Sequence, residues 1–395
     1  MARRSTLDFL KTETASGLIL ALAALAGLVL ANSPLAERYF TFVNQEITVQ
    51  VAAFRQTHSL LVWVKDGLMS VFFFVVGLEL KSEVLRGELA NPRRIALPVL
   101  AALGGMIAPA GLYLLINQGA GGAPQGWPTP TATDIAFALA ALTIAGPRLP
   151  HALRAFLLTL AIASDLAAVG LIAMLYTEDV HFVALGGAAA ALGLMALLGR
   201  WKNAPFLFYA VCFVLAWAFT LESGVTPSIV GAVAAMTVPI DPRRPGEESP
   251  LRHFMRSIHP YVAFLILPLF AFSASGFSLA GLSLSALAAP VPMGVALGLF
   301  LGKQAGVFGA TALAIGLKLG RRPTGAKWLE LYGVALLSGV GFTLSLFIGG
   351  LAFDADDATG QAGVRLGVFA GSLLSLAFGM AVLALAQRLR SAERA

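Results

Sequence analysis

Three charged residues stand inside long apolar stretches of this 395-residue chain, and their types could support ion chemistry. Asp134 lies in TDIAFALAAL, Asp165 in AIASDLAAVGLIA and Lys303 in ALGLFLGKQAGV. A charge inside a membrane span costs about 2.5–3.5 kcal/mol on insertion scales, and by default it marks function. The alternative is a structural role, as an ion pair between helices or as a carboxylate that accepts hydrogen bonds from helix ends.

The chemistry that these groups allow is cation exchange. A buried carboxylate can hold a proton or, with hydroxyls, carbonyls and water, a small hard cation, but it cannot readily hold both. Burial disfavours the charged form of a carboxyl group, which brings proton binding towards physiological pH. Competition at one carboxylate then couples cation movement to proton movement without a covalent step, provided that the site opens alternately to the two sides.

Two of the apolar stretches carry signals that break a helix. Two prolines precede Asp134 in WPTPTATD, and proline removes a backbone donor and clashes with the preceding turn. The stretch SGVGFT at 338–343 places the flexible residues Gly339 and Gly341 between hydroxyls, although close helix packing at glycine is an alternative reason for them. Interrupted helices in two halves of a chain point to a transporter site near the bilayer midplane. Opposed half-helices would bring like dipole ends together, and Asp134 and Lys303 could offset that charge.

The elements that must position these residues are membrane helices. The chain is 58% hydrophobic and 12% charged, whereas soluble domains are roughly 45–50% apolar and about 25% charged. A membrane helix needs about 20 mainly apolar residues. This criterion predicts twelve spans, near 13–32, 59–80, 95–117, 124–145, 151–176, 181–199, 204–221, 224–239, 257–274, 288–316, 327–352 and 362–386.

The connections indicate the orientation of the spans. With the N-terminus inside, 22 of the 27 Lys and Arg residues fall in the inner connections and four fall in the outer ones. This bias predicts that both termini are cytoplasmic. The first outer connection resembles a short β-hairpin at 39–51, in which 40–43 and 47–51 flank Asn44-Gln45-Glu46. The GLFLG stretch before Lys303 indicates close helix packing and not a phosphate-binding loop.

The chain resembles the NhaA family of sodium/proton antiporters over nearly its whole length. The resemblance rests on several stretches taken together: Gly77-Leu-Glu79-Leu-Lys81, Gly104 to Pro109, Pro130 to Leu139 (PTATDIAFAL), Ser164-Asp165-Leu166, His259-Pro260, Leu265 to Phe272 (LILPLFAF), Gly302-Lys303 and Gly339 to Thr343 (GVGFT). It implies an all-α membrane fold of twelve helices with inverted-topology repeats, in which the broken fourth and eleventh helices cross near the midplane.

The resemblance also implies an organisation of the chain as a single transporter unit. Residues 1–82 would supply interface helices one and two with the outer hairpin, and 224–274 would supply interface helices eight and nine. Residues 95–176 and 288–386 would form the two core repeats, and 181–221 the linking helices. The implied cargo is Na+, Li+ and H+, without a cofactor, and the implied assembly is a homodimer in the bacterial inner membrane.

Site residues follow from the matched motifs. Asp165 matches the principal carboxylate that binds cation and proton, and Lys303 matches the core lysine. Asp134 and Thr133 match residues at the broken fourth helix, so that Na+ would bind transiently at Asp165 and Asp134. The remaining matched positions are Ser164 beside the site, Gly339, Gly341 and Thr343 in the second broken helix, and Asp66, Glu79 and His259, which would affect ion access or the response to pH. Glu79 could instead be a helix-end carboxylate near Lys81.

One departure from the family pattern falls inside the site. The family usually has two adjacent aspartates in the fifth span, whereas this chain has Ser164 before Asp165. Because the missing aspartate pairs with the lysine in the family, Lys303 would lack its usual partner. The protein could then exchange fewer protons per sodium, for example electroneutrally, or Lys303 could carry the second proton itself. We favour the second, because an intramembrane lysine without a role would be costly.

Two further departures from the family pattern concern regulation by pH. Thr226 and Met255 replace a histidine and a glutamate that the family often has, which predicts a shifted or shallower activation by pH.

Other function classes fit the sequence less well. A net charge of +6 could suggest nucleic acid, but the basic residues fall in short loops and not in one patch. An organic-anion transporter on a related fold and a channel remain alternatives. An intramembrane hydrolase would need a nucleophile with a base, or a metal cluster, and the sequence shows neither.

Overall fold

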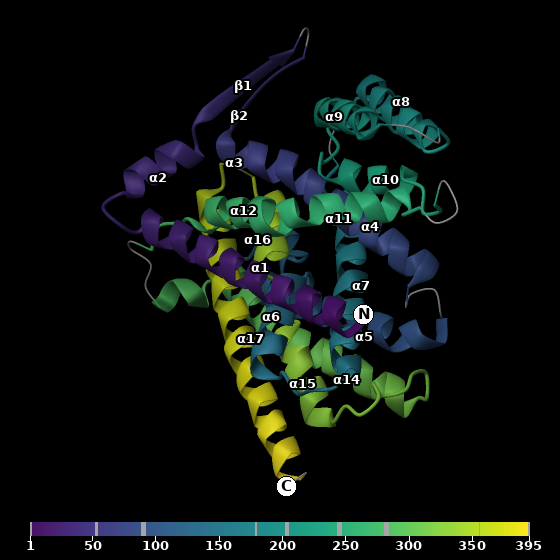
Figure 1. Ribbon diagram of the computed structural model, residues 1–395. Helices are drawn as coiled ribbons and strands as arrows, with labels where there is room; N and C mark the ends of the chain where they lie inside the picture. The colour runs from purple at the N-terminus through teal and green to yellow at the C-terminus, as the bar shows by residue number, and fades with distance from the viewer. Residues whose placement is uncertain are drawn as a thin grey trace. The chain divides into compact units, whose positions relative to one another are not determined.

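The computed structural model describes residues 2–51, 54–87, 92–177, 180–201, 205–242, 247–279, 284–354 and 356–393. Lys202, Arg243, Arg244 and Arg394, which the charge bias includes, lie outside the described residues. The chain is mostly helical with one small sheet (Figure 1). It divides into two compact units, Met1–Leu22 with Asn91–Ala168 and Phe277–Ala395, and Ala23–Ala90 with Val169–Gly276.

The first unit holds all three charged residues with which the sequence argument began. Its helices are α5 (Pro92–Asn117), α6 (Ile135–Ala145), most of α7 (His151–Leu175), α13 (Pro290–Leu297), α14 (Lys303–Gly316), α15 (Trp328–Leu337), α16 (Phe342–Ala352) and α17 (Ala358–Ala392), together with the first part of α1 (Ala2–Ala31). A π-helical turn, η7 (Gly298–Gly302), joins α13 to α14 without a break in the helix. Short 3-10 turns at Pro124–Gly126 (η3), Thr129–Thr131 (η4) and Leu284–Ala288 (η6) complete this unit.

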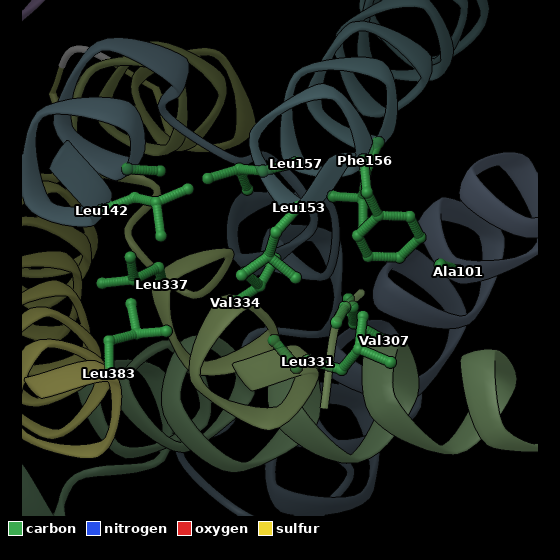
Figure 2. Close-up of a cluster of buried hydrophobic side chains, with 14 of the residues drawn as sticks. Ala101, Leu142, Leu153, Phe156, Leu157, Val307, Leu331, Val334, Leu337 and Leu383 are labelled. Carbon is green, nitrogen blue, oxygen red and sulfur yellow. The ribbon is translucent and has the colours of Figure 1, made fainter. Parts of the chain in front are cut away.

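The core of the first unit is an apolar cluster built from helices far apart in the sequence (Figure 2). Leu142 of α6 and Leu153 and Leu157 of α7 contact Val334 and Leu337 of α15 in this cluster, and all five side chains are fully buried. Burying a large apolar side chain contributes about 1.5–3 kcal/mol relative to leaving it in water. This packing fixes α6 and α15, next to whose ends site residues lie, and α7, which carries Ser164 and Asp165 within the helix.

The second unit contains the small sheet and the remaining helices. These are α2 (Ala36–Val43), β1 (Glu46–Val51), β2 (Phe54–Ser59), α8 (Phe182–Leu198), α9 (Phe206–Glu222) and α10 (Ile229–Thr237). Two long helices are each continuous through a π-helical turn: α3 (Leu60–Trp63), η1 (Val64–Leu68) and α4 (Met69–Arg86), and α11 (Pro250–Tyr261), η5 (Val262–Ile266) and α12 (Leu267–Ser275). Pro260 lies two residues before the second π-helical turn, and a proline inside a helix removes a backbone hydrogen bond.

The hairpin predicted at 39–51 is wrong in its first strand and in its turn. Residues 40–43 belong to α2, because Tyr39 and Val43 lie four positions apart and bury the same face of a helix. The strand expected at 47–51 is present as β1, but it pairs with β2 in an antiparallel register in which Glu46 lies opposite Ser59. Short apolar runs fit a strand and a helix equally well, and long-range packing decides between them.

The helices establish a multi-pass membrane protein. Among the described residues, seven helices are long and apolar enough to cross a membrane, and the bent pair α15 and α16 makes an eighth. Helices α6, α8 and α9 are apolar but shorter, and α10 has nine residues. Apolar side chains such as Leu22, Met174 and Leu373 are exposed on the long helices, as contact with lipid requires.

Candidate ion-binding site

The first break lies in the segment before α6. The turn η4 is followed by Ala132 and Asp134 in extended backbone conformations, and α6 begins only at Ile135. Pro128 and Pro130 account for this interruption, because a proline has no backbone N–H with which to continue a helical ladder. The sequence prediction that this apolar stretch is broken just before Asp134 is confirmed.

The second break separates α15 from α16, which are bent by 44° relative to each other. The four residues between them, 338–341, include the two glycines that the sequence argument singled out. A Cβ added at Gly339 would lie 2.2 Å from the carbonyl oxygen of Leu299, and one added at Gly341 would lie 3.0 Å from that of Ala132. Gly339 is therefore required by the close approach of another backbone segment, whereas at Gly341 the nearest atoms belong to the side chains of Ser345 and Leu299.

The two breaks are bonded directly to each other. The backbone N–H of Asp134 donates to the carbonyl of Val340 at 2.6 Å, and the hydroxyl of Thr133 donates to the carbonyl of Ser338 at 2.9 Å. These two carbonyls are among the groups that the interruption of a helix releases from its own ladder. The extended segment before α6 therefore satisfies backbone groups that the end of α15 leaves free.

The carboxylate of Asp134 joins the N-termini of two half-helices. Its Oδ2 accepts hydrogen bonds from the backbone N–H and from the hydroxyl of Thr343, at 3.1 and 2.6 Å, in the first turn of α16. Its Oδ1 accepts from the backbone N–H of Phe137 at 3.3 Å, in the first turn of α6. Because both N-termini carry partial positive charge, one buried carboxylate between them stabilises both helix ends.

Lys303 contacts the C-terminal end of η4, whereas Asp134 contacts helix N-termini. Its ammonium group is fully buried and donates to the carbonyl of Thr131 at 2.5 Å and to the hydroxyl of Thr133 at 2.9 Å. The Thr131 carbonyl ends η4, where backbone carbonyls carry partial negative charge. Thr133 in turn donates to Ser338 at the end of α15, so the lysine contacts the first broken segment directly and is linked to the second through one hydroxyl.

The π-helical turn before Lys303 explains how the lysine reaches this position. A Cβ added at Gly298 would lie 2.8 Å from the Cβ of Pro130, and one added at Gly302 would lie 2.6 Å from the Cα of Pro109. The GLFLG stretch is therefore a packing surface, as its sequence predicts. It holds the start of α14 against η4 and α5 and thereby places the lysine beside the first break.

Ser164 and Asp165 bring α7 to the same place. Asp165 is 3% exposed, and its carboxylate interacts electrostatically with the ammonium group of Lys303. The hydroxyl of Ser164 donates to the carbonyl of Thr131 at 3.3 Å, which is the carbonyl that also accepts from Lys303. Lys303 therefore has two neutral oxygen acceptors and the charge of Asp165 around it.

The predicted site residues Asp66, Glu79 and His259 belong to the second unit. Asp66 lies in η1, where its backbone carbonyl accepts from the hydroxyl of Ser70 at 2.5 Å and from the indole N–H of Trp217 at 3.0 Å. Glu79 lies in α4, and His259 lies in the last turn of α11.

Lys81, the last residue of the GLELK motif, stabilises the end of a helix in the second unit. Its ammonium group donates to the carbonyls of Met236 and Val238, both at 2.6 Å, at the C-terminal end of α10. A cation at the C-terminus of a helix is favourable because the last carbonyls carry partial negative charge.

One ion pair in the first unit, between Glu330 and Arg390, was not predicted from the sequence. Glu330 is fully buried in the first turn of α15, and the guanidinium group of Arg390 near the end of α17 donates to both of its carboxylate oxygens, at 2.7 and 2.9 Å. The backbone N–H of Lys327 donates to the same carboxylate at 2.8 Å. The available signal was an acid at the third position of a helix, where a side chain reaches back to the cap residue.

Two interrupted helices that contact each other at their breaks, with a buried lysine and two buried aspartates around them, define a secondary transporter. The chain belongs to the Na+/H+ antiporter 1 family, whose sequence profile matches residues 7–383. The family prediction made from the motifs is confirmed. Because this is a family of transporters and not of enzymes, the hydrolase alternative is excluded.

Curated relatives match the chain over nearly its full length. It is 46% identical to the Na(+)/H(+) antiporter NhaA of Bordetella parapertussis over 379 residues, which cover 95% of each chain. It is 47% identical to the protein of the same name from Rhodospirillum rubrum, over 98% of this chain and 99% of the relative. It is 44% identical to the Na(+)/H(+) antiporter NhaA 2 of Erythrobacter litoralis, over 98% and 96% of the two chains.

Proposed function

We propose that this protein exchanges Na+ for H+ across the bacterial inner membrane, with cation and proton competing for the carboxylate of Asp165. The observation that carries the proposal is the burial of Asp165 beside Lys303 and beside a break lined by hydroxyls and backbone carbonyls. Carboxylate, hydroxyl and carbonyl oxygens are the ligands that hard cations prefer. Li+ would use the same oxygen ligands, and alternating access would expose them to one side at a time.

Topology and assembly extend this proposal. Twelve spans with both termini in the cytoplasm would follow if α6, α8, α9 and α10 each belong to a span, in addition to the longer helices. The interrupted segments 124–145 and 328–352 would be the middle helices of inverted repeats at 95–176 and 288–386. The hairpin of β1 and β2 would support a homodimer.

The contacts of Lys303 suggest how Na+ binding could release a second proton. Its two hydrogen-bond acceptors, the Thr131 carbonyl and the Thr133 hydroxyl, carry no formal charge. Asp165 would first release its own proton, and the sodium ion that takes its place would neutralise the negative charge that favours the protonated ammonium group of Lys303. Lys303 would then give up its proton as Na+ binds, and two protons would move against one sodium ion. The alternative is electroneutral exchange, in which Lys303 stays charged throughout.

Dilution-driven exchange in everted membrane vesicles tests the role of Asp165. Asp165→Asn should abolish the pH change that Na+ drives, because the amide can neither release a proton nor neutralise a cation. Asp356→Asn is the matched control, since Asp356 is an exposed carboxylate in the same unit, and it should leave exchange unchanged. Intact exchange in the Asp165 variant, at equal protein amount in the membrane, would disprove the proposal.

Reconstituted proteoliposomes distinguish the two stoichiometries. Under an imposed membrane potential, exchange that moves two protons per sodium ion should change rate with the potential, because net charge crosses the membrane. A rate that does not respond to the potential would establish electroneutral exchange and rule out Lys303 as the second carrier. Ser164→Asp in the same assay would show what a second carboxylate beside Lys303 changes.

A shallow activation by pH is the remaining part of the proposal. Thr226, which stands where the family often has a histidine, donates its hydroxyl to the carbonyl of Tyr176 at 2.8 Å in the second unit. Neither Thr226 nor Met255 has a group that titrates near neutral pH. Exchange measured in vesicles between pH 6.5 and 8.5 should therefore change less steeply than in relatives that carry the two ionisable residues.

A further inference from the structure

Two buried hydroxyls beside the breaks differ from the neighbouring hydroxyls in their hydrogen bonding. Thr129 and Ser345 are fully buried, and within the described part of the chain neither hydroxyl has a hydrogen-bond partner. The neighbouring hydroxyls of Thr131, Thr133 and Thr343 are all bonded to protein atoms. A buried polar group left without a hydrogen bond destabilises the fold, so a pair of them beside the breaks requires an explanation.

Both hydroxyl-bearing side chains lie between η4 and α16. A Cβ at Gly341 would lie 2.4 Å from the Ser345 hydroxyl and 3.0 Å from the Ala132 carbonyl, so these two oxygens flank the same point. Thr129 is the first residue of η4, and η4 packs against α16. Its methyl group would lie 3.2 Å from a Cβ at Gly349, which follows Ser345 by one turn of α16.

We propose that Thr129 and Ser345, with the carbonyl of Ala132, bind one water molecule that bridges η4 to α16. Three polar partners are the usual number for a buried water. Each hydroxyl can donate or accept, so the water satisfies both hydroxyls and donates to the carbonyl. None of the three groups carries a formal charge that would neutralise a cation, whereas the proposed Na+ site has the carboxylate of Asp165. The bridge adds an exchangeable link between the two interrupted helices, beyond the direct bonds at Thr133 and Asp134.

The sign of a stability change tests this proposal on the purified protein in detergent. If the pair is bridged by water, Thr129→Val and Ser345→Ala each remove one partner and should lower the unfolding temperature by a few degrees. The double variant should fall no further than the lower single variant, because the same water is lost once. If the pair is dry, removing an unsatisfied hydroxyl should raise the unfolding temperature instead, and this result would overturn the proposal.

Two controls complete the experiment. Thr311→Val removes a buried hydroxyl that already donates to the carbonyl of Val307 at 2.6 Å, so its effect should add to that of either variant. Ser345→Thr keeps the hydroxyl and should retain most of the native unfolding temperature. Every measurement is repeated with NaCl and with choline chloride. A loss at Thr129 or Ser345 that occurs only in NaCl would replace the water by a sodium ion and refute the proposal as stated.

Discussion

Removing the carboxylate of Asp134 should destabilise the protein strongly, because it serves three donors at two helix N-termini. In Asp134→Ala the backbone N–H groups of Thr343 and Phe137 lose their acceptor inside the protein. A hydrogen bond to a charged group is worth about 1.5–3 kcal/mol, and loss of an N-cap costs about 1 kcal/mol. Bonds between membrane helices average roughly 0.6 kcal/mol, so we take values near the low end of these ranges for each contact. We therefore expect a loss of about 3–4 kcal/mol for the alanine variant.

A graded series separates the charge of Asp134 from its hydrogen bonds. Asp134→Asn keeps one acceptor oxygen but loses the favourable interaction of a negative charge with two helix ends, so it should lose about half as much. Thr343→Val removes only the hydroxyl donor and should cost about 1 kcal/mol. It should also cost less in the Asp134→Ala background than in the native protein, because its acceptor is already gone.

The assay is equilibrium unfolding of the purified protein in mixed micelles, followed by tryptophan fluorescence. A loss of 3–4 kcal/mol changes the unfolding equilibrium constant by a few hundred-fold, since about 1.4 kcal/mol is tenfold. The expected order of stability is native, then asparagine, then alanine. If the alanine variant were as stable as the native protein, Asp134 could not be the group that stabilises these two N-termini.

Three further perturbations test other contacts in the first unit by the same unfolding assay. Gly341→Ala should cost about 1–3 kcal/mol through crowding at the break, whereas Gly309→Ala, where no atom lies within 4 Å of the added Cβ, should cost nothing or stabilise. Glu330→Gln should cost about 1.5–3 kcal/mol by removing the charged acceptor of the partly buried guanidinium group of Arg390, and a loss below 1 kcal/mol would contradict this assignment. The hydrogen bond and charge of Lys327 lower the pKa of the exposed Glu393 carboxyl below its ordinary value of 4.5, so the pair stabilises the protein above that pH and the contribution is lost as the pH falls through the lowered value. Glu393→Gln should therefore be less stable than the native protein at pH 7, and the difference should shrink as the pH is lowered.

The breaks and the buried charges could be predicted because their signals are local. Two prolines before Asp134 and two glycines before Thr343 interrupt a helix whatever lies around them. A charge in an apolar run is equally visible in the sequence, and this is how Asp134, Asp165 and Lys303 were found. That the two interrupted helices meet at their breaks came from the resemblance to the NhaA family and not from these local signals.

The features that were missed depend on contacts between residues far apart in the chain. Glu330 stands near a predicted helix end and looks solvated, and only its partner 60 residues away shows that it is buried and paired. The segment 36–43 reads as a strand or as a helix until Tyr39 is seen to donate its hydroxyl to the carbonyl of Phe272 at 2.7 Å. The unsatisfied hydroxyls of Thr129 and Ser345 have no sequence signal, because serine and threonine are normally satisfied by their own helix.

The surroundings of Asp134 and Asp165 give these two aspartates different roles. A cation could be coordinated by both oxygens of Asp134 only if it displaced the N–H donors of α6 and α16. The partial positive charges of the two helix N-termini would then face each other without a negative charge bonded to them. Asp134 is therefore better suited to hold the crossing together than to exchange its partner in every cycle. Asp165 lies on α7, beside the ammonium group of Lys303, where a change of charge alters the balance of the site without breaking a helix end. On this reasoning Asp134→Asn should weaken the fold and retain measurable exchange, whereas Asp165→Asn should keep the fold and lose exchange.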